Sequence, residues 1–167
     1  MKGEKWMRKK YTRNSDLTHY KTNQLTTNCG SYALRLNEWY HLNLRFEDIV
    51  QEWTDVWVKE KNEEGYSDLE ISCLYGEILV DCMLEDFKGE LEICDGELPK
   101  EDNVELIAFN TFCFCEELDY PDVDFHFKVY RDGVWKEKCG SGAVRECDGY
   151  HWGSYIGEPI YLYHKIK

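Results

Sequence analysis

The chain has 167 residues, of which 43% are hydrophobic and 15% aromatic, and it carries a net charge of −13 at pH 7. This composition excludes a disordered chain, and the length suits one domain with a substantial core rather than two. Residues 1–13 carry six basic residues against one acidic residue, a net charge of +5, which leaves −18 for the remainder. Because so acidic a body repels phosphate backbones, no direct nucleic-acid binding is expected.

The termini and the apolar runs predict where the protein resides. The N-terminus is charged and no apolar segment follows it, which indicates that there is no secretory signal. No apolar run approaches the ~20 residues that a membrane span needs. We therefore predict a cytoplasmic protein that does not bind membranes and whose eight cysteines are reduced. Since no Ser/Gly/Pro-rich linker divides the chain, residues 1–19 are interpreted as a basic, flexible arm and residues 20–167 as one domain.

Three helices are predicted in the first half of the chain. Residues 26–28 are natural N-cap residues, and apolar residues recur at helical spacing after them, which predicts a helix of about ten residues beginning at residue 29. Residues 45–57 have the pattern of an amphipathic helix whose tryptophans face the core. A Ser-x-x-Glu capping box that begins at Ser67 starts a third helix, which ends near Gly89.

Four strands are predicted in the second half, at residues 104–114, 124–131, 134–138 and 158–166. The dipeptide Asp132-Gly133 is a turn signal that joins the second and third of them as a hairpin. The glycine-rich residues 139–157 are interpreted as loop. Because the helices come first and the antiparallel strands follow, the predicted fold class is α+β.

Cys29 is the candidate nucleophile. The start of a helix supplies partial positive charge and unpaired amide donors, which favour a thiolate and can hold an oxyanion. A thiol nucleophile also needs a general base, and histidine is the usual partner. Among the five histidines, His126 is the strongest candidate because it lies in a predicted strand between Phe125 and Phe127, whose side chains point to the opposite face. Each of the two residues alone is equally consistent with a structural role.

Two stretches carry a family resemblance: "Asn28-Cys29-Gly-Ser-Tyr-Ala-Leu" and "Asp124-Phe-His126-Phe-Lys-Val-Tyr-Arg-Asp-Gly-Val-Trp-Lys-Glu-Lys-Cys-Gly140". They resemble the papain-like cysteine hydrolase superfamily, and within it the small members of bacteria and their phages. The resemblance implies a papain-like fold, in which N-terminal helices pack on a C-terminal antiparallel sheet and the cysteine heads the central helix. Cys29 would be the nucleophile, and His126 would deprotonate it and then protonate the leaving group. The chain departs from the family pattern at Cys139, where the family has proline.

The resemblance also implies two further roles. An upstream polar residue would complete the oxyanion hole, and Gln24 is assigned to it, with Asn23 and Asn28 as alternatives. A third residue would orient the imidazole. Asp148 and Glu137 are both candidates, and Asp148 is favoured because its loop can fold back over the site.

The implied function is a thiol hydrolase, a cysteine peptidase or amidase that cleaves an amide or isopeptide bond without a cofactor or metal. The expected partner is a protein or peptide substrate, which for a phage-encoded member is a host protein in the host cytoplasm. The acidity and the lack of a visible wall-binding domain argue against a cell-wall substrate.

Two alternatives remain open. One is a non-catalytic acidic binding protein on a degenerate papain-like fold, such as a phage inhibitor that blocks a basic surface or mimics nucleic acid. The other is a zinc module that would use thiols and an imidazole at irregular spacing: Cys113, Cys115, Cys139, Cys147 and His151. The simpler interpretation is that most of the cysteines are small buried apolar residues.

Overall fold

The computed structural model describes residues 11, 20, 25–115 and 120–166. In this part of the chain four helices precede six strands, so the α+β class is confirmed. The helices are α2 (Cys29–Leu34), α3 (Leu42–Val50), α4 (Thr54–Glu63) and α5 (Asp68–Asp86). The strands are β1 (Leu91–Cys94), β2 (Val104–Phe114), β3 (Asp122–Arg131), β4 (Val134–Lys138), β5 (Val144–Glu146) and β6 (Ile160–Lys165). Among the described helices, none is both long and apolar enough to cross a lipid bilayer.

The strands form one sheet in the order β1-β6-β2-β3-β4-β5, with every neighbouring pair antiparallel. The predicted hairpin between β3 and β4 is confirmed. Asp132 (φ 56°) and Gly133 (φ 80°) both have positive φ angles, as a two-residue turn between twisted strands requires. The last strand, β6, lies between β1 and β2, so the C-terminal segment forms an internal strand of the sheet.

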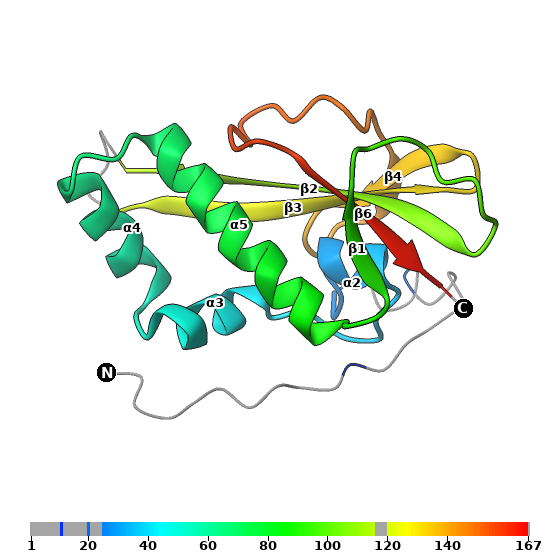
Figure 1. The fold of residues 1–167 in the computed structure, drawn as a ribbon, viewed down its shortest axis with the longest axis horizontal. Helices are drawn as coiled ribbons and strands as arrows, with labels where there is room; N and C mark the ends of the chain where they lie inside the picture. Colours follow the sequence, from blue (N-terminus) through cyan, green and yellow to red (C-terminus); the bar gives the residue numbers. More distant parts are fainter. Residues whose placement is uncertain (1–10, 12–19, 21–24, 116–119, 167) are drawn as a thin grey trace.

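The two faces of the sheet have different covers. Figure 1 shows α5 running across β2 and β3, and the segment between β5 and β6 passing over the sheet on the other side from α3 and α4. The main core lies under the helices, where Phe109 of β2 and Phe127 of β3 are buried. A smaller apolar cluster around Leu106, Ala108 and Trp135 lies on the opposite face. Because side chains alternate between the two faces along each strand, a residue's position in its strand decides whether it packs under the helices or under the loop.

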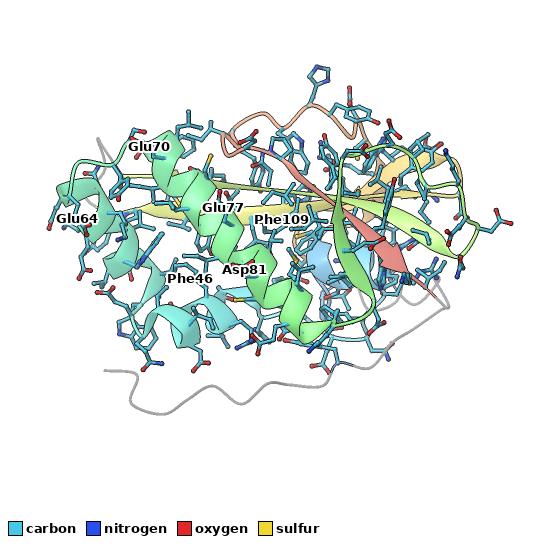
Figure 2. All side chains as sticks on the ribbon, viewed as in Figure 1. Phe46, Glu64, Glu70, Glu77, Asp81 and Phe109 are labelled. Carbon is cyan, nitrogen blue, oxygen red and sulfur yellow. The ribbon has the colours of Figure 1, made fainter. Side chains whose placement is uncertain are left out.

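Acidic side chains gather on the solvated face of α5. Figure 2 shows Glu70, Glu77 and Asp81 along this helix, and all three are exposed. Phe46 and Phe109 instead belong to the buried core. The helix thus divides acidic residues from apolar ones, which is the usual arrangement of a surface helix.

The first predicted helix is shorter than expected. α2 has six residues instead of about ten, because Arg35 adopts a left-handed conformation (φ 58°) and its N–H turns back to the carbonyl oxygens of Ser31 and Tyr32. The predicted N-cap is confirmed, since the Asn28 side chain accepts a hydrogen bond from the Ser31 N–H.

The second predicted helix is two helices. α3 ends at Gln51, which has φ 58°, and α4 begins where the Glu47 carboxylate accepts hydrogen bonds from the N–H and hydroxyl of Thr54. Because of this break, the two tryptophan side chains do not point to the same side. Trp57 is buried as predicted, whereas the core prediction for Trp53 is wrong, since 53% of its surface is exposed.

The remaining elements follow the sequence closely. The predicted capping box at Ser67 and Glu70 is present at the start of α5, and β2 has the predicted bounds. Two short strands were not predicted: β1, and β5 within the glycine-rich loop. In the predicted arm only Tyr11 is described, and its ring packs against Tyr40 (centroids 5.1 Å apart). The rest of residues 1–19 lies outside the described residues.

Buried charged side chains of the sheet hold α2 at both ends. At its C-terminal end, the Arg131 guanidinium donates to the carbonyl oxygens of Tyr32 (3.1 Å) and Ala33 (3.2 Å). The same guanidinium makes two 2.7 Å hydrogen bonds with the Glu105 carboxylate, which also accepts from Arg35. At the other end, the Lys138 ammonium donates to the Thr27 carbonyl oxygen at 2.7 Å. Because so short a helix is unstable alone, these contacts define its position.

Replacing Glu105 with Gln is expected to lower the free energy of unfolding by about 3–5 kcal/mol, because it leaves the buried Arg131 charge without its partner. Burial of Glu105 opposes its ionisation, but the hydrogen bonds from Arg131 and Arg35 outweigh burial and lower its pKa to about 2. A carboxyl pKa lowered by folding stabilises the protein above pH 4.5, and this contribution disappears as pH falls from about 4.5 through about 2.

Urea unfolding at pH 7 and between pH 5 and 2 measures both effects. The control is Glu77→Gln on the exposed face of α5, which should stay within about 0.5 kcal/mol of the wild type. Equal stability of the two variants at pH 7 would contradict the prediction.

Candidate active site

The backbone around Cys29 is fixed by short-range packing. The Asn28 side chain, besides capping α2, donates to the Tyr40 carbonyl oxygen at 3.1 Å. Gly30 permits the helix to approach β3 closely, since a Cβ atom there would lie 3.0 Å from ring carbons of both Phe127 and Tyr40. The absence of a side chain at residue 30 therefore brings the start of α2 against the strand that carries the candidate histidine.

His126 lies on the face of β3 that the loop between β5 and β6 covers. Its ring is buried and stacks on Tyr155, with centroids 5.5 Å apart. Asn110 is the cross-strand partner of His126 on β2, and its amide donates to the Tyr155 carbonyl oxygen at 2.8 Å. Lys128, on the same face of β3, donates to the Asp148 carbonyl oxygen at 2.6 Å. These bonds hold the loop over the imidazole.

Cys29, His126 and Glu137 form one chain of interacting side chains. The His126 Nε2 atom lies 2.7 Å from the Glu137 Oε1 atom. The Cys29 thiol lines the same pocket as this ring and interacts electrostatically with it. Because Nε2 faces the carboxylate, Nδ1 is the ring nitrogen that is available to the thiol. The arrangement is a nucleophile, a base and an orienting carboxylate in sequence.

The charges in this chain stabilise one another. Burial of His126 opposes its protonation, but hydrogen bonds with Cys29 and Glu137 outweigh burial and raise its pKa to about 9. The hydrogen bond from His126 is the largest influence on Glu137 and, together with the 2.8 Å bond from Arg145, lowers its pKa to about 2. At neutral pH these two side chains are therefore an imidazolium and a carboxylate.

Glu137 takes the place that the sequence analysis preferred for Asp148. The Asp148 carboxylate lies 2.5 Å from Nδ1 of His151, on an exposed part of the loop, and it does not pair with His126. The reason is the register of the hairpin. β4 returns directly alongside β3, so Glu137 faces the histidine across a strand pair. Asp148 lies eleven residues after Glu137, beyond β5.

Of the three candidates for the oxyanion hole, the structure describes one, Asn28. Gln24 and Asn23 lie outside the described residues. The Asn28 side chain is occupied by the cap and by both backbone groups of Tyr40. The structure therefore uses Asn28 to build the start of α2.

The five predicted zinc ligands are not gathered at one place. The backbone N–H groups of Cys113 and Cys115 bond to side chains of α5 on the helical face of the sheet, whereas His151 pairs with Asp148 on the other face. All eight cysteines are free thiols. Four of them are buried, which includes Cys29, and Cys139 is exposed. The zinc module proposed from those five residues is thus not formed.

A pocket of about 350 Å³ opens beside Cys29 and His126. Its walls combine aromatic side chains with polar groups, and they include one carboxylate, that of Asp124. Tyr155 lines the pocket beside this carboxylate and interacts with it. The other wall residues include Trp39, Tyr75, Val123 and Phe125. A substrate group that enters the pocket would therefore lie next to the thiol.

Tyr155 and Asn110 have roles at the site that the sequence analysis did not anticipate. Tyr155 lies in a segment interpreted as loop, and Asn110 lies inside an apolar strand, where a polar residue facing the loop was the available signal. No family model, curated protein or solved structure matches the chain. The papain-like resemblance therefore stays a prediction.

Replacing Glu137 with Gln is expected to slow the reaction of Cys29 with iodoacetamide at neutral pH by about tenfold or more. The reason is the lost hydrogen bond to a charged imidazole, which is worth about 1.5–3 kcal/mol. The rate is measured by mass spectrometry of the peptide that contains Cys29. Asp148→Asn is the control and should leave the rate unchanged. A slow Asp148→Asn protein beside a normal Glu137→Gln protein would reverse the assignment.

Proposed function

We propose that the protein is a thiol hydrolase that cleaves an amide or isopeptide bond in a protein or peptide. The single observation that supports this most strongly is that Cys29 and His126 line one pocket and interact electrostatically, while the His126 Nε2 atom lies 2.7 Å from Glu137. A helix-borne cysteine followed by a histidine on an antiparallel sheet is also what a papain-like fold requires. We therefore include membership of that superfamily in the proposal.

The three side chains divide the chemistry as follows. His126 accepts the Cys29 proton, and the thiolate attacks the carbonyl carbon of the scissile bond. The imidazolium then gives this proton to the departing amine, which leaves Cys29 as a thioester. His126 next takes a proton from water, and the hydroxide attacks the thioester and expels the Cys29 thiolate. The imidazolium then returns its proton to this thiolate as the carboxylic product leaves. Glu137 holds the ring and stabilises its positive charge throughout.

The loop over His126 supports this assignment. Tyr155 covers one side of the ring, and Trp152 contacts it edge-on with centroids 6.3 Å apart. Aromatic rings that exclude water strengthen the interaction between the imidazolium and its anionic partners. They also restrict rotation of the imidazole, so that Nδ1 keeps facing the thiol.

The pocket favours a substrate with a basic group next to the scissile bond. Aromatic walls and the Asp124 carboxylate are the combination that binds a cation, and the body of the protein is strongly acidic. A basic side chain would lie over the aromatic rings with its charge toward Asp124.

The proposal is tested with an activated ester, p-nitrophenyl acetate. The wild type is expected to release a burst of nitrophenol and to carry an acetyl group on Cys29. Cys29→Ala should show neither, with thermal stability close to the wild type, and His126→Ala should acylate about 100-fold more slowly or worse. Cys73→Ala on α5 is the control with unchanged kinetics.

A wild type that is not acetylated on Cys29 would contradict the proposal. It would favour the alternative of a non-catalytic acidic binding protein, which the net charge of −13 supports. A Cys29→Ala protein that is several kcal/mol less stable would identify the thiol as a core residue.

The pocket assignment predicts charge selection by the thiol. Methanethiosulfonate reagents that carry either a trimethylammonium or a sulfonate group differ mainly in charge, and the cationic reagent is expected to modify Cys29 faster. Asp124→Asn should lower the cation-to-anion rate ratio by about fivefold, the effect of roughly 1 kcal/mol of Coulomb energy in a hydrated site. Asp122→Asn, on the same strand but outside the pocket lining, should leave the ratio unchanged. Equal effects of the two variants would contradict the assignment.

A further inference from the structure

The thiol of Cys139 lies beside the imidazole of His126 and the carboxylate of Glu137. Among the residues that the structure describes, His126, Glu137 and Cys139 offer an imidazole nitrogen, a carboxylate oxygen and a thiol sulfur that lie within 4.8 Å of one another. Extending the β3–β4 register beyond Val129 and Lys136 sets Cys139 directly across from His126. The three donors therefore come from two neighbouring strands and the residue that follows one of them.

We propose that His126, Glu137 and Cys139 form a regulatory Zn²⁺ site whose occupancy switches the hydrolase off. Zinc prefers nitrogen and sulfur ligands together with carboxylate oxygen, in tetrahedral geometry with ligand distances of about 2.0–2.3 Å. Donor atoms around such an ion lie roughly 3–4 Å apart. The His126 Nε2 and Glu137 Oε1 atoms lie 2.7 Å apart, so these two side chains have to separate slightly to admit the ion. Cys139 is exposed, so its side chain can turn toward the ion.

Metal binding and catalysis would exclude each other at one imidazole ring, through its two nitrogen atoms. The Nε2 lone pair of His126 binds the ion, the proton on Nε2 leaves to solvent, and the ring keeps its remaining proton on Nδ1. The ring then cannot accept the Cys29 proton. Cys139 also loses its thiol proton to solvent when its sulfur binds. The metal site rests on the donor atoms alone, whereas its inhibitory effect rests on the proposed function.

Arg145 would oppose the metal. Its guanidinium bonds to the second oxygen of Glu137 at 2.8 Å and interacts with the Cys139 sulfur. The side chain is long and 66% exposed, so it can swing away when the ion enters. A cation near the donors lowers the affinity for Zn²⁺ by repulsion. Arg145 therefore sets the metal concentration at which the site fills.

The experiment titrates metal-free full-length protein with Zn²⁺ against a chromogenic chelator and, separately, with Co²⁺ as a spectroscopic probe. One equivalent of each metal is expected to bind, and the cobalt complex should show the charge-transfer absorption of a metal-bound thiolate. Loss of an outer hydrogen-bond partner of a zinc site costs about 10–100-fold in affinity, so Cys139→Ser should cost at least that. Arg145→Gln should bind more tightly than the wild type, and Cys73→Ser should be unchanged.

A second arm separates this proposal from the proposed function. Cys29→Ala should bind Zn²⁺ as the wild type does, and Zn²⁺ should slow alkylation of Cys29 in the wild type but not in Cys139→Ser. If metal binds but Cys29 is not acetylated by the ester, the hydrolase proposal fails and the metal site stands. If Cys29 is acetylated while Cys139→Ser binds Zn²⁺ as tightly as the wild type, the metal site is overturned.

Discussion

The position of α2 is the constraint on which the rest of the structure depends. A six-residue helix is not stable alone, and in this protein side chains of the sheet bind both ends of the helix. Lys138 binds the backbone just before Cys29, and Arg131 binds the last carbonyl groups of the helix. Both cations are buried: Arg131 ends β3, the strand that carries His126, and Lys138 ends β4, which pairs with β3. The β3–β4 hairpin thus sets the positions of both Cys29 and His126.

The same hairpin explains why the orienting carboxylate is Glu137. Alternation on paired strands puts His126, Lys128 and Glu137 on the face that the glycine-rich loop covers. The loop itself contributes packing, with Tyr155 on the imidazole and its backbone bonded to Asn110. Each functional group is therefore held by strand register and the loop closes the site.

The exposed thiol at residue 139 changes what this site can do. In the resembled family the residue at that position is proline, which has no metal-binding atom. Cysteine there adds a soft donor within reach of the imidazole and the carboxylate. Under the two proposals, the side chains that would activate the thiol and those that would bind zinc are largely the same, so the two activities would compete.

The sequence by itself determined what is local. Helical spacing and a capping box defined α5, alternation defined β2, and Asp132-Gly133 defined the hairpin. It also singled out Cys29 and His126, because a helix start and a strand position each carry a local chemical signature. Only the tertiary structure decided that Glu137 and not Asp148 faces the ring, and that Cys139 lies beside it. Both positions depend on the register of the strands and on the path of the loop. Register and loop path are determined by burial and by hydrogen bonds between residues far apart in the sequence, which leave no periodic pattern in it.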